Sequence, residues 1–339
     1  MVTIADVARE ARVSISTVSY ALTGKRSISE ETKKRVIETA QRLGYTARAS
    51  ARALAANRSE IVAVTAPFHP ATDASAHMAF AMEITIQARA HDYDTLLLVH
   101  DDALAGMKRS AASALADGII VLDVSANDER AHVARSLTCP VVFIGVPDAA
   151  DGLVCVDLDF ELAIRLAVDA LVEHGHRAIA LISQPKAIMQ REPNFPLRME
   201  REFARYGAQR GLHVVIVHPD QDHADTAVAE LFARQPSTTA LVLSTTTGVV
   251  DSLDATLAGH GLSIPSEISV ITAGMMTPSY ASQQFDAFPL EPQLTCPVAV
   301  KQLVELMAGQ GPPPGVTLVA PTYRPRGTVA AAPITASTP

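Results

Sequence analysis

The chain has 339 residues and a net charge of −8; apolar residues make up 48% of it, aromatic residues 4%, and tryptophan is missing. This length exceeds one small core, so two or three domains are expected. Because there is no run of about 18 apolar residues and no apolar stretch near Met1, we expect neither a membrane span nor a secretory signal, and therefore a cytoplasmic protein.

The first 45 residues have the pattern of three short helices with polar caps. Thr3, Ser14 and Ser29 each precede an apolar stripe at helical spacing and can cap its helix. Gly44 follows the third stripe, where a residue with positive φ commonly ends a helix. A tight turn joins the first two helices, which predicts a helix-turn-helix whose second helix enters the DNA major groove.

The charge of this segment separates it from the rest of the chain. Residues 1–60 hold eleven Lys or Arg and six Asp or Glu, a net charge of +5, so the remaining residues carry −13. A basic module on an acidic body suits a phosphate-backbone partner, because binding releases counterions condensed on the nucleic acid. A three-helix core without a ligand would explain the caps and stripes as well, but it would not explain the charge.

Four strings in this segment resemble the amino-terminal signature of the lactose-repressor (LacI/GalR) family: Thr3-Ile4-Ala5-Asp6-Val7-Ala8, Val13-Ser14, Thr17-Val18-Ser19 and Leu43-Gly44-Tyr45. The resemblance implies a homodimeric repressor that binds a near-palindromic operator in double-stranded DNA and responds to a small-molecule effector. The base-reading positions of the family correspond to Ile15, Ser16 and Tyr20. Contacts with the DNA backbone or the groove edge are expected from six further side chains: Thr3, Ser14, Thr17, Ser19, Lys33 and Arg35.

An alanine-rich stretch at residues 48–56 resembles the hinge helix of this family. In relatives this helix orders on operator DNA and inserts a leucine into the minor groove, and Leu54 matches that leucine. Arg52 and Ala55 are expected beside it in the groove. A helix this short is marginal on its own, and an apolar wedge can unstack a flexible base step. The alternative is a linker helix in which Leu54 packs on its own protein.

From residue 61 onward, buried strands alternate with amphipathic helices, a pattern typical of parallel sheets covered on both faces. Nine strands are predicted: Ile61–Pro67, Thr95–His100, Gly118–Leu122, Pro140–Gly145, Leu153–Val156, Ala178–Ser183, His213–His218, Ala240–Ser244 and Ile268–Ala273. The clearest helices between and after them are Ala76–His91, Phe160–His174, Phe195–Arg210, Val249–His260 and Pro292–Met307. Pro312–Gly315 predicts a turn, and Leu318–Pro321 and Tyr323–Gly327 predict two closing strands.

The expected fold is an all-α helix-turn-helix head joined by a hinge helix to an α/β body of two doubly wound lobes, similar to periplasmic sugar-binding proteins. The head covers residues 1–47, the hinge and linker 48–59, and the body 60–330. The resemblance implies chain crossings near residues 158, 290 and 320. Lobe one then holds about 60–157 and 291–318, and lobe two about 158–290 and 319–330, with a frayed tail at 331–339. No heptad tail follows, which favours a dimer over a tetramer.

Ligands of open α/β sheets bind at the carboxyl ends of the strands. That rule selects seven candidate effector contacts in the body: Phe68, His69, Asp123, Arg191, Thr245, Thr246 and Gly274. Arg198 is added because it corresponds to an arginine that contacts the effector in many relatives. The alternative for each of them is an exposed loop residue.

Two departures weaken a carbohydrate effector, which the family resemblance implies by default. Gly274 stands where sugar-binding relatives carry an aspartate, and Ser244–Thr247 replaces an Asn-Asp pair. Carboxylates and amides that hold polyols are thus missing from two positions. A less hydroxylated ligand, or a regulator without an effector, therefore remains open.

An enzyme on a doubly wound sheet is the alternative class, and little in the sequence favours it. There is no GxGxxG after Ile61–Pro67, no GxxxxGK[ST] and no GxSxG. His174 and His176 stand at the expected end of a helix, where a partly charged imidazole is favourable. The three cysteines are widely spaced and lie in or beside apolar runs. We expect no catalysis, no cofactor and no metal site.

Overall fold

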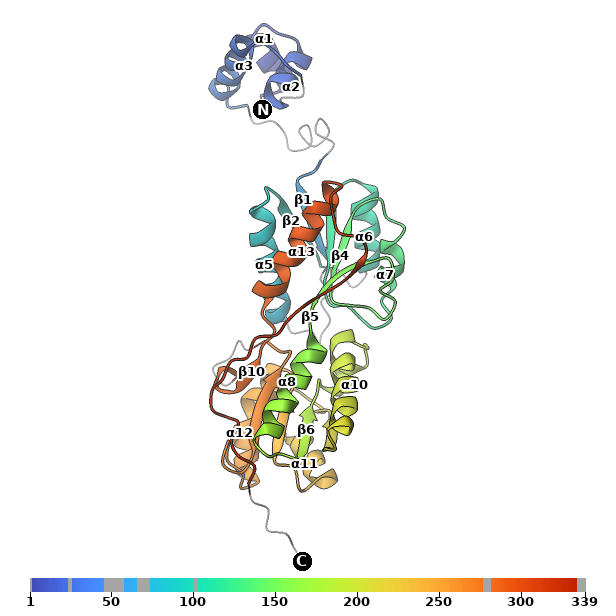
Figure 1. Cartoon of the computed structure of the whole chain (residues 1–339). Coiled ribbons are helices and arrows are strands. Elements are labelled where there is room, and N and C mark those ends of the chain that lie inside the picture. Colours follow the sequence, from blue (N-terminus) through green and yellow to red (C-terminus); the bar gives the residue numbers. More distant parts are fainter. Residues whose placement is uncertain are drawn as a thin grey trace, which may run out of the picture.

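The computed structural model describes residues 2–23, 26–45, 58–65, 74–99, 103–276 and 282–333. These residues form a small helical head and an α/β body of two lobes (Figure 1). The head holds α1 (Ile4–Glu10), α2 (Ile15–Thr23) and α3 (Glu30–Arg42). Val7, Val18 and Val36, one from each helix, are fully buried against one another, which is the core that the apolar stripes predict.

The first lobe is built on a six-stranded parallel sheet with the strand order β11-β5-β4-β3-β1-β2. Its strands are β1 (Ile61–Thr65), β2 (Asp94–Leu98), β3 (Gly118–Val121), β4 (Val141–Ile144), β5 (Val154–Leu158) and β11 (Gly315–Val319). The helices are α5 (Ala74–Arg89), α6 (Ala103–Ala112), α7 (Glu129–Ala134) and α13 (Pro292–Met307). α5 and α13 cover one face and α6 and α7 the other, so the central strands read as unbroken apolar runs.

The second lobe repeats this construction on a five-stranded parallel sheet with the order β10-β9-β8-β6-β7. Its strands are β6 (Ala178–Ile182), β7 (His213–Val217), β8 (Ala240–Leu243), β9 (Ser269–Ala273) and β10 (Asp286–Phe288). The helices are α8 (Phe160–Glu173), α9 (Lys186–Met189), α10 (Asn194–Gln209), α11 (Asp225–Arg234) and α12 (Thr247–Gly259), with a 3₁₀ turn at Ser282–Gln284. α8 and α10 cover one face, and α11 and α12 cover the other.

The chain passes between the lobes three times. It leaves the first sheet after β5 and enters α8 at Phe160, returns between β10 and α13, and leaves again after β11. After the last crossing, the segment around Arg324 to Ala330 binds the second lobe through Ala287, Asp286 and Ser269. The two lobes therefore meet along a seam at which the carboxyl ends of both sheets face each other (Figure 1).

The end of the chain differs from the sequence prediction. The first closing strand is Gly315–Val319, so Gly315 begins a strand and does not end a turn. The second, predicted at Tyr323–Gly327, is wrong: Arg324 makes a single antiparallel bridge to Ala287. The reason is that the backbone N–H groups of residues 326–329 donate to the Asp286 carboxylate, that of Thr328 at 2.9 Å, and not to the backbone of a neighbouring strand. β10 itself is too short to produce a recognisable pattern.

Candidate functional site

The second helix of the head presents a polar N-terminal end to solvent. Ser14 Oγ accepts the Thr17 backbone N–H at 3.1 Å and caps the helix. Val18 and Ala21 bury the inner face, which leaves Ile15 51% exposed and Ser16 exposed beside it. Tyr20 is half-buried, and the Arg26 guanidinium lies 5.7 Å from the centre of its ring. The three predicted base-reading side chains thus lie on one helix, with Ile15 and Ser16 the most accessible.

Several of the predicted backbone contacts already have partners within the head. The Thr3 hydroxyl donates to Asp6 at 2.7 Å in the capping box of α1. Thr17 lies with its hydroxyl 2.8 Å from Ser14 Oγ. Arg35 Nε donates to the Ala11 carbonyl at 3.2 Å, which fixes α3 against the end of α1. Arg35 therefore has a structural role whether or not it meets DNA.

Five predicted contacts fall outside the described residues: the hinge residues Arg52, Leu54 and Ala55, and the strand-end residues Phe68 and His69.

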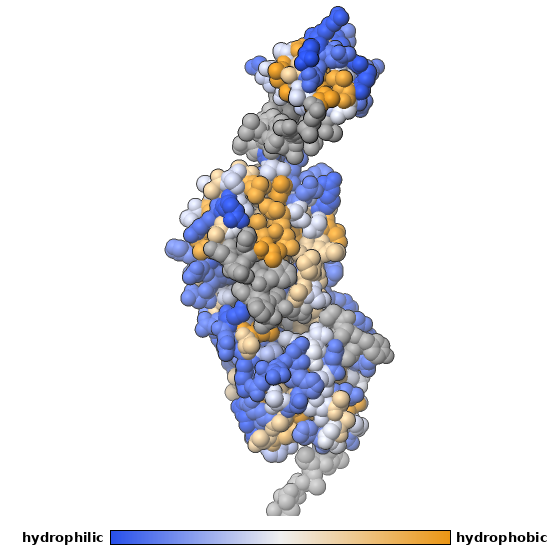
Figure 2. All heavy atoms as spheres, turned by 180° about the vertical axis from the view of Figure 1, so that it is seen from behind, coloured by the Kyte–Doolittle hydropathy of each residue, from blue (hydrophilic) through white to orange (hydrophobic). Residues whose placement is uncertain are grey.

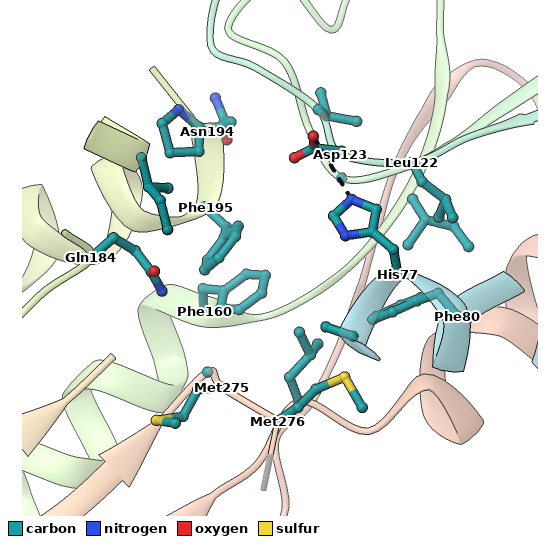
Figure 3. A pocket seen from close by; sticks show the side chains of 18 of the residues that line it. His77, Phe80, Leu122, Asp123, Phe160, Gln184, Asn194, Phe195, Met275 and Met276 are labelled. Carbon is teal, nitrogen blue, oxygen red and sulfur yellow. Dashed lines mark ion pairs between the residues drawn. The ribbon is translucent and has the colours of Figure 1, made fainter. Parts of the chain in front are cut away.

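A cleft of about 200 Å³ lies between the two lobes of the body. It is lined by residues at the carboxyl ends of strands from both sheets, as the strand-end rule predicts. Figure 3 shows Phe160, Phe195 and Gln184 on one side of the cleft, with His77, Asp123 and Phe80 across from them. Met275 and Met276 complete the wall below. The lining is therefore mainly apolar, with a few polar groups.

Asp123 is the centre of the polar cluster in the cleft. Its carboxylate accepts Arg191 Nη2 at 2.7 Å and lies 3.7 Å from His77 Nε2 (Figure 3). Burial alone would raise the pKa of Asp123, but the hydrogen bond from His77 and the charge of Arg191 lower it to about 2. Asp123 is therefore ionised at neutral pH, and its charge is already balanced by its neighbours.

The same region joins the lobes by a clasp, which we define as residues 123–126 of the first lobe and 191–194 of the second. Ala126 N donates to the Glu192 carbonyl at 2.8 Å, and Asn194 N donates to the Val124 carbonyl at 3.1 Å. The Arg191–Asp123 ion pair adds a third link. Asp123 and Glu192 both have positive φ, 53° and 50°, a conformation that costs energy for residues other than glycine. The clasp is thus a specific inter-lobe contact beside the cleft.

Six of the predicted effector contacts lie in the described part of the chain; five of them line the cleft, and one, Arg198, does not. Asp123, Arg191, Thr245, Thr246 and Gly274 all line the cleft.

Arg198 is placed differently. Its guanidinium binds Asp157 at 2.6 Å and Glu161 at 2.7 Å, and its side chain is 12% exposed. Asp157 lines the cleft, but Arg198 is not one of the lining residues, because these two carboxylates hold it behind the wall. Met199, its neighbour on α10, is fully buried, and its sulfur accepts the Ser244 hydroxyl at 3.3 Å.

The aromatic wall of the cleft was not predicted. Phe160 and Phe195 stack with ring centroids 4.9 Å apart at 25°, and each begins or nearly begins a helix, α8 and α10. Because these helices start at the seam, their first-turn side chains reach the same edge as the strand ends. An aromatic residue in the first turn of a helix that follows a lobe crossing is a signal that could have identified Phe160.

The two histidines at the end of α8 have structural partners. His176 is fully buried, and its two ring nitrogens lie 2.9 Å from the hydroxyls of Thr239 and Ser269. His174 Nδ1 lies 2.8 Å from the Ala170 carbonyl at the end of α8. Over the described ranges there is no group of three or more metal-ligating side chains.

The cysteines are free thiols. Burial raises the pKa of Cys139 to about 11 and that of Cys155 to about 12, so neither is a thiolate at neutral pH.

No helix within the described parts of the chain is long and apolar enough to span a membrane.

Two sequence families match separate parts of the chain. Residues 3–47 match the bacterial regulatory proteins of the lacI family, and residues 168–329 match the periplasmic binding protein-like domain. Catabolite control protein A of Priestia megaterium is 29% identical over 283 residues, which cover 80% of this chain and 81% of that protein. The HTH-type transcriptional regulator AglR of Rhizobium meliloti is 27% identical over 80% of this chain and 78% of its own.

Solved structures share the fold. The lac repressor dimer bound to operator and the anti-inducer ONPF superposes with a TM-score of 0.81 at 20% identity, covering 97% of this chain and 99% of that one. The complex of the transcriptional regulator CelR with cellobiose superposes with a TM-score of 0.66 at 18% identity, covering 97% of this chain and all of that one. These likenesses extend over the head and both lobes.

Proposed function

Since this chain is a member of the LacI family of DNA-binding transcriptional regulators, we propose that it is a repressor that binds a near-palindromic operator as a homodimer. A small molecule in the inter-lobe cleft adjusts the affinity for the operator. The observation that carries the proposal is the capped helix α2, which presents Ile15 and Ser16 to solvent on a basic head. A regulator of chromosomal DNA acts in the cytoplasm, and no catalytic step is proposed.

Selection of bound DNA from random sequence tests the reading of bases. The wild-type protein should select two inverted half-sites, because a symmetric dimer requires a symmetric operator. Ser16→Ala should change the preferred half-site, since one good base contact contributes about 1–3 kcal/mol of discrimination. Lys33→Ala should weaken all sites alike, because a phosphate contact carries no sequence information. An unchanged half-site for both Ser16→Ala and Tyr20→Ala would mean that another face of the head reads DNA.

The hinge is proposed to bend the operator through Leu54. The support is its match to the wedge leucine of the family, together with the basic neighbour Arg52. Leu54→Ala should lower operator affinity and the DNA bend angle together, because the side chain fills the unstacked base step. Circular-permutation gel shifts measure the angle. Leu22→Ala is unsuitable as a control, because Leu22 packs against the core of the head. A full bend with the alanine variant would show that Leu54 packs on its own protein.

The homodimer is proposed to form through the first lobe. Met78, Met82 and Ile86 recur every four residues along α5 and are 44%, 60% and 56% exposed, which is an apolar stripe open to solvent. Figure 2 shows apolar side chains gathered on the first lobe, whereas the second lobe is mostly hydrophilic in the same view. A stripe of this kind is suited to pairing with its own copy about a twofold axis.

Met82→Glu should therefore raise the dissociation constant of the dimer a hundredfold or more, because an unpaired buried charge costs about 3–5 kcal/mol. Light scattering over a dilution series measures the change. Leu115→Glu is the matched control, since Leu115 is 44% exposed and follows α6 on the opposite face of the sheet. Equal behaviour of the two variants would place the dimer interface elsewhere.

The effector is proposed to occupy the cleft, in line with the CelR–cellobiose complex, whose protein shares this fold. A sugar is the family default, and a regulator with a different ligand or with none is the second candidate, favoured by the apolar lining. Repeating the DNA selection with a panel of metabolites identifies whether a ligand lowers or raises the affinity of the protein for its operator. If no ligand alters the selected pool, the proposal of an effector-controlled repressor is wrong.

A further inference from the structure

We propose that the cleft binds a flat aromatic molecule that carries N–H or O–H donors, and that free sugars are poor ligands. This inference rests on the proposed function only in taking the cleft as the effector site. It is drawn from the side chains that line the cleft in this chain.

The apolar surface of the cleft suits a flat ring. Phe160 is 2% exposed, and its ring stacks on Phe195 at 4.9 Å, so the two form a rigid aromatic wall on the second lobe. Phe80 of the first lobe lies across the cleft, and Met275 and Met276 lie below (Figure 3). Aromatic rings pair favourably at centroid distances of about 4.5–7 Å, and methionine sulfur also contacts aromatic rings favourably. A ring between these walls would meet carbon or sulfur on most of its surface.

Two buried oxygens along this surface lack partners. Thr245 and Asn194 line the cleft and are 3% and 2% exposed, and neither Thr245 Oγ1 nor Asn194 Oδ1 has a hydrogen-bond partner among the residues that the structure describes. The identity of the asparagine oxygen follows from its other side, because Asn194 Nδ2 donates to Asp148 at 3.0 Å. An unpaired buried polar atom costs about 1–3 kcal/mol. A ligand N–H or O–H would remove that cost at Asn194, where only a donor can bind.

A polyol finds few partners here. The space in which sugar-binding relatives place a carboxylate is filled: a Cβ at Gly274 would lie 2.6 Å from Phe160 Cδ1 and 2.9 Å from Met199 Cε. Gly274 also has φ +63°, which disfavours any other residue. Asp123 is engaged by Arg191 and His77, and the Thr246 hydroxyl donates to Asp222. A sugar hydroxyl in this part of the cleft would therefore meet the Phe160 ring in place of a carboxylate.

The test is a series of small probes measured by ligand-detected NMR on the full-length protein. p-Cresol carries a ring and a donor, toluene only the ring, 4-methylcyclohexanol only the donor, and glucose many donors without a ring. We expect p-cresol to bind at least about fivefold more tightly than toluene, since one hydrogen bond to a buried group contributes about 1 kcal/mol. The same margin is expected over 4-methylcyclohexanol, because the flat ring contacts Phe160 and Phe195 better.

Variants locate the binding. Thr245→Val should remove part of the advantage of p-cresol over toluene, whereas Thr256→Val, near the other end of α12, should leave it unchanged. Gly274→Asp should lose p-cresol binding without gaining glucose, because the new side chain displaces Phe160. Gly211→Asp is its control, since Gly211 has a similar φ of +66° and open space around its Cβ position.

Three outcomes would overturn the inference: no binding of p-cresol, equal binding of p-cresol and toluene, or tighter binding of glucose than of p-cresol. If the operator selection succeeds alongside any of these outcomes, the proposed DNA-binding function is supported and only the ligand class is wrong. If the operator selection fails but p-cresol binds as expected, the ligand class is right and the proposal of a DNA-binding repressor is wrong.

Discussion

Operator affinity should fall by about 10³ to 10⁵ between about 50 and 200 mM salt, if the dimer contacts 6–10 phosphates. Residues 1–60, the head with the hinge and linker, carry +5, and the rest of the chain carries −13, so the attraction to DNA must come from this N-terminal segment. Each neutralised phosphate releases condensed counterions, with a slope of about −0.9 in the log–log plot. Fluorescence anisotropy of a labelled operator over a salt series measures the slope.

The control for this prediction changes one cation in each part of the chain. Lys33→Ala should reduce the slope by about one for each protomer, whereas Lys301→Ala on α13 should leave it unchanged, because Lys301 belongs to the acidic body. A slope shallower than about −3 would mean that few phosphates are contacted. An equal effect of both substitutions would place part of the DNA contact on the body.

Asp286→Ala should lower the free energy of unfolding by about 3 kcal/mol or more, one of the largest losses available to a single substitution here. Asp286 is 2% exposed at the start of β10, and its carboxylate accepts the backbone N–H groups of Arg326, Gly327, Thr328 and Val329. Hydrogen bonds to a charged acceptor are stronger than neutral ones. Alanine would leave these donors without an acceptor and weaken the attachment of the C-terminal segment to the second sheet.

Urea unfolding followed by circular dichroism measures the loss. Asp286→Asn should be intermediate, because the amide keeps one acceptor oxygen and loses the charge. Asp254→Ala, an exposed position on α12, should change the free energy of unfolding by less than about 0.5 kcal/mol. A loss for Asp286→Ala no larger than that of Asp254→Ala would show that the C-terminal segment does not depend on this carboxylate.

The sequence predicted the elements in which a local signal and the tertiary environment agree. α8 and α13 begin where expected, at Phe160 and Pro292, and the strands buried on both faces are found as apolar runs. The end of the chain was mispredicted because four successive backbone N–H groups, those of residues 326–329, donate to one distant side chain, Asp286, and not to a strand with a periodic pattern. Such a contact leaves no trace in the spacing of apolar residues.

The cleft was predicted as far as the strand-end rule reaches. Asp123, Thr245 and Gly274 follow strands and line the cleft. The rule says nothing of helix starts, so the wall of Phe160 and Phe195 was missed. It also cannot show whether a charged side chain is already paired. Arg198 was added from the family resemblance, and two carboxylates hold it behind the wall.

The clasp has a kinetic consequence for any molecule in the cleft. The covalent crossings tie the lobes together along the seam, and the clasp ties them again through Ala126, Asn194 and the Arg191–Asp123 pair. Asp123, Val124, Arg191, Pro193 and Asn194 belong to both the clasp and the lining. A molecule that leaves past them must wait until these bonds open together, so its residence time depends on the opening rate of the clasp. In the proposed regulator, the delay between the loss of the effector and the response of the gene would then depend on residues 123–126 and 191–194, separately from the affinity of the site.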